Sequence, residues 1–309
     1  MGRRIKKLTF ITILIVGIPA GCSSDNIGPP QEKYMVEDSC QNRVMQNLKM
    51  DRMVLLYENQ DELMKKLNLA AQIIQWEREQ AGLKANEFAE VNEILKVQPD
   101  VVIGLSDHID ERACKVSKKL SEHGIQPILM EYKNVQQLKE SVHKLGLLTG
   151  RTMEAKQWGD EVDNSLEQVK TAIAKSPVKK VYWEFDFKPN QIESGMDQGL
   201  TLAGTHLLNE LLTFAGGTNI AEKERVEPTS SYAAMKEVEI MEANPDILFI
   251  PVGSSNLFSY TRPEKRRNWD KIEAVKENRL YEVNPETYDI GRLPETIVWL
   301  ATHMHPDAF

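Results

Sequence analysis

The stretch Thr152–Lys175, TMEAKQWGDEVDNSLEQVKTAIAK, predicts one long amphipathic helix. Its large apolar residues recur at spacings of four, four, three and four: Trp158, Val162, Leu166, Val169 and Ile173. This spacing places them in one stripe, while Lys, Glu, Asp and Gln occupy the other faces. Ser176-Pro177 ends the helix, because the residue before a proline disfavours the α region. At 1.5 Å per residue the helix would be about 35 Å long, enough to cross a domain.

Two similar segments flank this helix. Upstream lies Glu93–Ile103, EILKVQPDVVI, and downstream lies Glu239–Phe249, EIMEANPDILF. Each reads as the end of a helix, a Pro-Asp turn and a short buried strand. Two copies on either side of one long helix indicate two similar lobes that the helix joins.

Apolar runs alternate with helical patterns on both sides of the helix. In the first half we expect strands at 52–56, 72–76, 101–105 and 127–130, and helices at 61–69, 86–97, 110–122 and 135–148. In the second half we expect strands at 180–187, 247–252 and 280–283, and helices at 205–215, 233–243, 268–277 and 295–305. This alternation predicts an α/β fold with two lobes, each a mostly parallel sheet flanked by helices. The predicted boundaries are 49–150 for the N-terminal lobe, 151–176 for the interlobe helix and 177–309 for the C-terminal lobe.

The N-terminus has the pattern of an export signal. Four basic residues within positions 3–7 precede Leu8–Ile18, an apolar run too short to span a bilayer as a mature helix. Pro19-Ala-Gly-Cys22 resembles a bacterial lipoprotein cleavage site, although such sites usually carry Leu where Pro19 stands. We therefore expect a signal peptide at 1–21, lipidation of Cys22 and a lipidated tether at 22–48. The alternatives are an ordinary secretory signal cut near Ala20, or an uncleaved anchor.

Net charge and cysteine content bear on the partners of the protein and on its disulfide bonding. Without residues 1–21, which hold four cations and no acid, the formal net charge falls from −8 to −12. An acidic body argues against a nucleic acid or an anionic membrane as partner. Cys40 and Cys114 remain, with no C-x-x-C spacing. Outside the cytosol the two thiols can pair, and the sequence leaves open whether they do.

From Arg52 to Phe309 the chain resembles the helical-backbone class, class III, of ABC-importer substrate-binding lipoproteins, which serve ferric siderophores, haem and cobalamin. Five segments carry the resemblance in order: RMV…DEL…L at 52–67, GIQPI at 124–128 with LG…TGR at 145–151, LNELLTFAGGTN at 208–219, RLYEV at 279–283 and HPDAF at 305–309. The resemblance implies a ligand cleft between the lobes, where the carboxyl ends of the strands face each other. It also implies only a small closure, because one rigid helix bridges the lobes.

The predicted strand ends supply candidate ligand-binding residues. They are Tyr57, Trp76, Arg78, Asp107, His108, Tyr132, Trp183, Tyr232, Tyr288 and Arg292, with Glu131, Glu184, Phe185 and Asp289 beside them. Large planar or chelated ligands need aromatic faces for apolar contact and a few charges for orientation. Because acids outnumber the two arginines, a neutral or weakly charged chelate, such as a ferric hydroxamate or a corrinoid, fits better than a tri-anionic catecholate. About half of these aromatics should be ordinary core, and Trp183, inside a strand, could face either way.

Two histidine patterns offer metal ligands, and a structural explanation is preferred for both. His108 beside Asp107 could bind a metal with Glu131, but a solvated loop pair is the simpler interpretation. His303 and His305 lie two residues apart on a helix, where their rings diverge. We therefore expect no metal site and no cofactor.

The resemblance also implies docking onto the permease through one glutamate on each lobe, early in the helix before the Pro-Asp turn. Those positions hold Asn92 and Val238 here. The flanking carboxylates could take over by pairing with permease arginines: Glu90, Glu93, Glu237 and Glu239. Ordinary solvated helix carboxylates are the alternative.

Enzyme signatures are missing from the sequence: it has no G-x-S-x-G, no G-x-G-x-x-G after a strand and no Walker lysine motif. The leading hypothesis is a monomeric, extracytoplasmic, lipid-anchored binding protein that is not an enzyme. Its partners would be a small-molecule metal chelate and the permease and ATPase subunits of an importer, with no nucleic acid. The alternatives are a chelatase-like enzyme acting on a tetrapyrrole, and a surface lipoprotein without a transporter.

Overall fold

The computed structural model describes residues 35–46, 49–76, 87–191, 196–204, 206–222, 232–251 and 261–309. The predicted signal peptide, Cys22 and Arg78 lie outside these residues. Tyr34–Phe309 forms one compact unit. Within the described part of the chain, none of the helices has the length and hydrophobicity that crossing a membrane requires.

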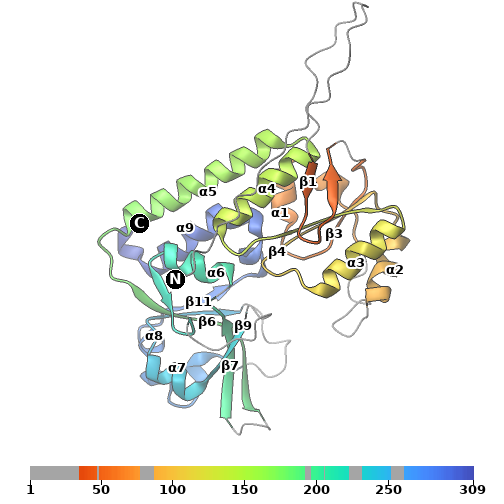
Figure 1. Ribbon diagram of the computed structural model, residues 1–309. Helices are drawn as coiled ribbons and strands as arrows, with labels where there is room; N and C mark the ends of the chain where they lie inside the picture. The colour runs from red at the N-terminus through yellow and green to blue at the C-terminus, as the bar shows by residue number, and fades with distance from the viewer. Residues whose placement is uncertain are drawn as a thin grey trace, which may run out of the picture. The chain divides into compact units, whose positions relative to one another are not determined.

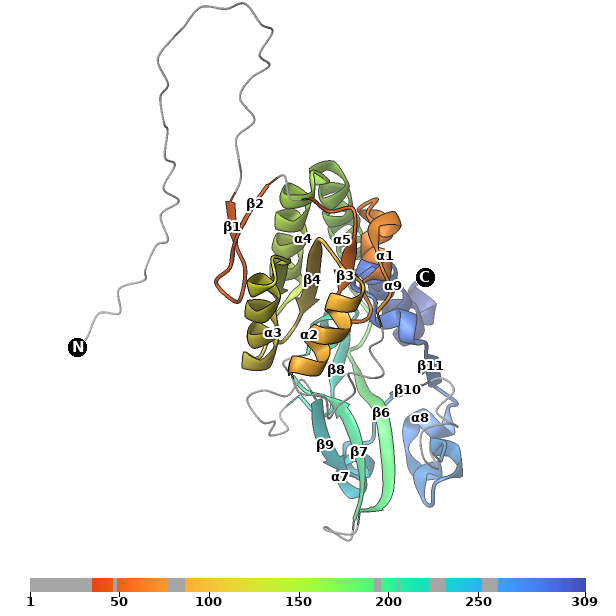
Figure 2. The same ribbon diagram turned by 90° about the vertical axis from the view of Figure 1, so that its right-hand side faces the viewer.

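The N-terminal lobe is built on a parallel three-stranded sheet of order β3-β4-β5, with β3 at Met53–Leu55, β4 at Val101–Ser106 and β5 at Gln126–Glu131. Helices α2 (Glu87–Lys96) and α3 (Glu111–Glu122) contribute to a core on one face, around Val54 and Val102. The strand residues that alternate with these valines, such as Ile103, point to the other face of the sheet. There they contribute to the core that α1 (Asp61–Lys66) and α4 (Val135–Thr149) cover. Figure 2 shows α2 and α3 on the side of the sheet away from α4.

The predicted strand at 72–76 is wrong. The chain there forms a 3-10 turn, η1 (Ala70–Gln72), and a single bridge between Ile73 and Met53. The reason lies in the next residues, because the indole Nε1 of Trp76 donates to the carbonyl oxygen of Leu55 at 3.0 Å. A longer strand would need that acceptor for its own backbone.

Residues 35–45 form an antiparallel hairpin of β1 (Met35–Glu37) and β2 (Arg43–Met45), where the sequence predicted a tether. Cys40 in its turn is joined to Cys114 of α3 by a disulfide, with Cα atoms 5.3 Å apart. The buried Asp38 carboxylate accepts hydrogen bonds from the turn and from the backbone N–H of Leu129 in β5, at 3.0 Å. The hairpin is therefore part of the N-terminal lobe, and the open question of the two thiols is answered.

The long helix predicted at 152–175 is α5, Thr152–Ala172. Trp158, Val162 and Val169 are buried on the predicted stripe. The helix lies along α4 of the first lobe and along α9 (Leu293–Met304) near the end of the chain (Figure 1). It ends three residues before the predicted limit, with Ile173 as its C-cap.

The C-terminal lobe contains a six-stranded mixed sheet of order β11-β10-β6-β7-β9, with β8 also paired to β6. The bounds are β6 Lys179–Gln191, β7 Met196–Leu202, β8 Gly217–Asn219, β9 Tyr232–Lys236, β10 Ile247–Pro251 and β11 Leu280–Val283. The pairs β10–β11, β10–β6 and β6–β8 are parallel, as the α/β prediction requires. The pairs β6–β7 and β7–β9 are antiparallel and were not predicted.

The helix predicted at 233–243 is wrong in its first four residues, which belong to β9. Ala233 and Met235 are buried and their neighbours are exposed, which is the period of two that a strand requires. The remaining helices are α6 (Leu207–Phe214), α7 (Glu237–Ala243) and α8 (Glu273–Lys276). Short 3-10 turns are η4 (Pro263–Lys265), η5 (Trp269–Lys271), η6 (Pro285–Tyr288), η7 (Ile290–Arg292) and η8 (Pro306–Ala308).

The two lobes also meet where α1 packs against η7. The Asp289 carboxylate accepts from the backbone N–H of Glu62 at 3.0 Å, and so satisfies a donor in the first turn of a helix from the other lobe. Close by, the N–H of Ile290 donates to the carbonyl oxygen of Asn59 at 3.1 Å. A Cβ atom on Gly291 would lie 2.0 Å from the backbone nitrogen of Leu63, so only glycine allows this approach. Backbone contacts as well as α5 therefore tie the lobes together.

Candidate functional site

A pocket of about 420 Å³ lies where the two lobes meet. The N-terminal lobe contributes the residues that follow β3, the end of β4 and the residue after β5. The C-terminal lobe contributes β6, α6, β9 and the segment from η6 to α9. The pocket thus lies at the carboxyl ends of the parallel strands of the first lobe, where ligands bind in sheets of this kind.

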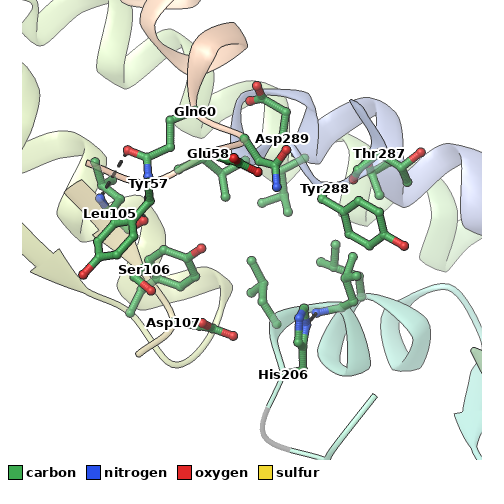
Figure 3. Close-up of a pocket in the computed structure, with 18 of the residues that line it drawn as sticks. Tyr57, Glu58, Gln60, Leu105, Ser106, Asp107, His206, Thr287, Tyr288 and Asp289 are labelled. Carbon is green, nitrogen blue, oxygen red and sulfur yellow. Dashed lines mark hydrogen bonds between the residues drawn. The ribbon is translucent and has the colours of Figure 1, made fainter. Parts of the chain in front are cut away.

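Five of the ten predicted ligand-binding residues line this pocket: Tyr57, Asp107, Tyr132, Tyr232 and Tyr288. Phe185 and Asp289, which were named beside them, also line it. Figure 3 shows Tyr57 and Asp107 on the side of the first lobe, and Tyr288 and His206 on the side of the second. The tertiary structure therefore brings Tyr57 and Asp289, which lie 232 positions apart in the sequence, to one pocket.

Other predicted residues lie elsewhere in the structure. Trp76 bonds to the backbone of β3, as described above. His108 lies in the loop after β4, with its Nδ1 atom 3.9 Å from a Glu131 oxygen, and Arg292 lies 3.6 Å from Glu62. None of the three lines the pocket. In the residues that the structure describes, no three His, Cys, Asp or Glu side chains are arranged to hold a metal ion.

Trp183 supports the pocket wall from behind. It is completely buried, and its ring centroid lies 4.9 Å from that of Phe249 in the core. Its Nε1 atom donates to the hydroxyl of Tyr288 at 3.3 Å. Trp183 therefore positions a pocket residue without facing the cavity itself.

Aromatic side chains form the wall on the side of the C-terminal lobe. The rings of Phe185 and Tyr232 meet edge to face, with centroids 4.9 Å apart. Tyr288 lies 5.9 Å from Phe185, and His206 lies 5.6 Å from Tyr232. Such a wall offers flat apolar surface to a bulky ligand and polar ring edges for orientation.

His206 is a pocket residue that sequence analysis missed. It occupies the N-cap position of α6, where its Nδ1 accepts a hydrogen bond from the N–H of Leu208 at 3.1 Å. Nδ1 must then be unprotonated, so the neutral ring carries its proton on Nε2. Burial lowers the pKa of His206, and the Asp107 carboxylate opposes that shift. Its position before an apolar helix was the available signal, although histidine is an unusual N-cap.

Gln60 was also missed, and it holds the first lobe's side of the pocket in shape. Its buried side chain donates to the carbonyl oxygen of Leu105 at 2.8 Å and accepts from the N–H of the same residue at 3.2 Å. Two bonds to one backbone unit connect the segment after β3 to β4 (Figure 3). A lone glutamine in a loop carries no pattern that would reveal this in the sequence.

The phenols of the pocket remain protonated at neutral pH. Burial raises the pKa of Tyr288 to about 12, partly offset by the hydrogen bond from Trp183. Burial also raises the pKa of Tyr57 and of Tyr132. The tyrosine side chains that line the pocket are therefore neutral.

The four predicted docking glutamates bond to donors of their own chain. Glu90 accepts from Arg112 at 3.0 Å, and Glu93 pairs with Lys96. Glu237 accepts from the indole of Trp269 at 2.6 Å, while Glu239 accepts from the backbone of Lys236 at 2.8 Å. Asn92 and Val238, at the positions that the resemblance assigns to docking, are exposed.

Comparison with known proteins agrees with this architecture. The sequence profile of a family described as periplasmic binding protein matches residues 75–287. YvrC of Bacillus subtilis strain 168, an uncharacterized ABC transporter substrate-binding lipoprotein, is 24% identical over 225 residues, which cover 71% of this chain. The aligned region is 66% of YvrC, so the match spans just under two thirds of that relative's length.

Solved structures share the fold. Helicobacter pylori CeuE, in a structure described as a Ni-His complex, is 18% identical, with a TM-score of 0.66 and 90% of each chain covered. Vibrio cholerae BtuF, a periplasmic vitamin B12 binding protein, is 16% identical, with a TM-score of 0.62; the match covers 84% of this chain and 97% of BtuF. Because the family profile spans more than half of the sequence and these two-lobed proteins share the fold, the chain belongs to the periplasmic binding protein family.

Proposed function

We propose that this protein is the substrate-binding lipoprotein of an ABC importer. It captures a metal chelate, such as an iron-siderophore or a corrinoid, in the pocket between its lobes and delivers it to the permease. It works as a carrier and not as an enzyme. The observation that carries this proposal is the aromatic-walled pocket of about 420 Å³, built by both lobes at the strand ends of a family member.

The size and lining of the pocket support a bulky ligand. A volume of about 420 Å³ falls within the usual range of small-molecule sites, roughly 300–1,000 Å³. The ring of Phe185 is in contact range of both Tyr232 and Tyr288, so one planar or rounded ligand can meet all three. The Ni-His complex named for CeuE and the vitamin B12 of BtuF are both metal chelates.

The charged side chains that line the pocket favour a metal chelate that is neutral or weakly charged. Its acids are Glu58, Asp107 and Asp289, and no arginine or lysine stands among its described lining residues. A tri-anionic catecholate would need buried cations to pair with. The proposed class is therefore a ferric hydroxamate or a corrinoid.

Tryptophan fluorescence is the direct test, because Trp183 contacts the pocket residue Tyr288. The protein, expressed without residues 1–21, is titrated with a ferric hydroxamate, cyanocobalamin, haem and a ferric catecholate. We expect submicromolar binding of a hydroxamate or a corrinoid, since each buried aromatic contact contributes on the order of 1–3 kcal/mol. Tight binding of the catecholate alone, weakened strongly by salt, would refute the proposed ligand class.

The alternatives make different predictions. A chelatase-like enzyme would change its tetrapyrrole, so mass spectrometry of the ligand recovered after incubation distinguishes carrier from enzyme. A surface lipoprotein without a transporter would bind ligand but leave cellular uptake unchanged when its gene is deleted. The importer proposal requires uptake to fall in that strain.

Anchoring and docking are proposals of the same kind. Cys22→Ser should release the protein from the membrane fraction, and an unchanged membrane-bound fraction would argue against lipidation. For docking, Glu90, Glu93, Glu237 and Glu239 are replaced together by Gln, which keeps an oxygen acceptor for their own bonds and removes the charge. Uptake should be lost while ligand affinity is unchanged. Uptake at the parental rate would mean that another surface docks.

A further inference from the structure

The carboxylate of Asp107 is the least compensated charge in the pocket. It follows β4 at the end of the first lobe's sheet and is half-buried. Among the described residues it has no hydrogen-bond or ion-pair partner. Lys133, which bonds to this loop, donates instead to the backbone carbonyl of Asp107 at 2.6 Å and to Glu131 at 2.7 Å.

By contrast, the Asp289 carboxylate, on the opposite side of the pocket, is already in use. It accepts from the N–H groups of Glu62 and Gly291, at 3.0 and 2.8 Å. The bond from Glu62 holds the lobes together, and both bonds satisfy the charge of Asp289 in part. A ligand could therefore bind to the Asp107 carboxylate without breaking any hydrogen bond between described residues.

The side chains opposite Asp107 are aromatic and uncharged. Figure 3 shows its carboxylate pointing toward His206 of the C-terminal lobe. The ring of His206 is tilted by 60° against that of Tyr232, and the ring of Tyr232 meets Phe185 edge to face. The negative charge of Asp107 reaches across to the C-terminal lobe. Burial raises the pKa of Tyr232, and the Asp107 carboxylate raises it further. The faces of these rings carry the negative part of the aromatic quadrupole.

A carboxylate facing aromatic rings is the arrangement that recognises a cation. The cation pairs with the carboxylate on one side, and the quadrupoles of the aromatic rings attract the same cation from the other side. A protonated His206 could supply that cation from the protein itself, but burial lowers its pKa, so the ring is neutral at pH 7. The positive charge must then come from the ligand.

We propose that the ligand of this pocket carries a positive charge, as an ammonium group or as the net charge of the chelate, which binds between the Asp107 carboxylate and the rings of Phe185 and Tyr232. This inference rests on the proposed function and narrows it, since a neutral chelate would satisfy that proposal but not this one. It predicts a preference within pairs of closely related chelates of which one is cationic and the other neutral.

Two such pairs test it. Ferrioxamine B is a ferric trihydroxamate with one free ammonium group, and its N-acetyl derivative lacks that charge. Aquacobalamin is cationic at pH 6.5, whereas cyanocobalamin is neutral. Dissociation constants are measured by fluorescence or calorimetry with the wild type, with Asp107→Asn and with the control Asp160→Asn. Asp160 is an exposed acid of α5, paired with Lys156, so its removal changes the net charge equally but leaves the pocket intact.

We expect the cationic member of a binding pair to bind at least tenfold more tightly to the wild type, which corresponds to about 1.4 kcal/mol. The preference should fall to threefold or less in Asp107→Asn and persist in Asp160→Asn. Equal affinity within the pair, or a preference that survives in Asp107→Asn, would overturn this inference and leave the proposed function standing. If no chelate of either pair or of the earlier panel binds, the proposed function fails and this inference falls with it.

Discussion

Gly291→Ala is the substitution that most directly tests the junction between the lobes. The added Cβ would lie 2.0 Å from the nitrogen of Leu63 and 2.4 Å from the carbonyl carbon of Glu62. Both atoms belong to the backbone of α1, so no side-chain rotation relieves the overlap. Ordinary van der Waals contact requires about 3.5 Å, and α1 and η7 must therefore separate by more than 1 Å.

That separation breaks a defined set of interactions. The hydrogen bonds at risk are those that hold η7: the N–H of Glu62 donates to Asp289 Oδ2, the N–H of Ile290 donates to the oxygen of Asn59, and Trp158 Nε1 of α5 donates to the oxygen of Gly291. Each contributes about 0.5–1.5 kcal/mol. Overpacking costs about 1–3 kcal/mol more. We expect the free energy of unfolding to fall by about 2.5–7.5 kcal/mol, and ligand affinity to fall with it because the same junction borders the pocket.

The matched control is Gly159→Ala in α5. There the new Cβ would meet only Lys139 Cε, at 3.7 Å, which is ordinary contact. An alanine inside a helix is favoured over glycine by about 0.5–1 kcal/mol, so this variant should gain slightly in stability. Urea denaturation followed by tryptophan fluorescence compares the two. A Gly291→Ala variant with the midpoint and ligand affinity of the wild type would refute the inferred junction.

Three further predictions concern the pocket wall, the disulfide and pH. Tyr132→Ala should weaken ligand binding tenfold or more, measured by calorimetry on the folded variant, because Tyr132 lines the pocket. Trp183→Ala should lower the free energy of unfolding by about 3–5 kcal/mol, measured by urea denaturation, because Trp183 is completely buried in the core. Cys114→Ser, which removes the disulfide, should cost about 2–4 kcal/mol, and an unchanged midpoint on reduction of the wild type would contradict this. Burial lowers the pKa of His206 and His305 in the folded state. Below about pH 6.5 the unfolded state therefore binds more protons than the folded state, and the free energy of unfolding should fall as the pH drops through that range. A urea midpoint that does not change with pH would be inconsistent with this prediction.

Local patterns were enough to predict much of the fold. The stripe on α5 was visible because a helix that is buried on one side must repeat its apolar residues every three or four positions. The Pro-Asp junctions before β4 and β10 were visible because proline ends a helix and a short apolar run follows it. The antiparallel strands β7 and β9 were not predicted, because β7 pairs with β6 and β9 pairs with β7 in antiparallel ladders, which the strand–helix alternation does not reveal. The alternation in β9 was short enough to be absorbed into the helix that follows it.

Some features of the candidate site could be predicted from local sequence, and others could not. The sequence by itself determined the ends of the strands, and therefore that Tyr57, Asp107 and Tyr132 would lie at one edge of the first lobe's sheet. It could not determine which aromatic rings face the cavity, because Trp183 and Phe185 lie two positions apart on one strand and only the packing of Phe249 and Tyr288 decides their roles.

The tertiary structure alone decided what opposes Asp107. The register between the lobes depends on backbone contacts at η7, which no side-chain pattern encodes. Those contacts place the N-cap of α6 and the ring of Tyr232 across the pocket from the end of β4. Local sequence specifies which residues end a strand or begin a helix, because those choices depend on neighbours along the chain. Which ends then face each other depends on the packing of distant surfaces, and that is where the chemistry of this pocket arises.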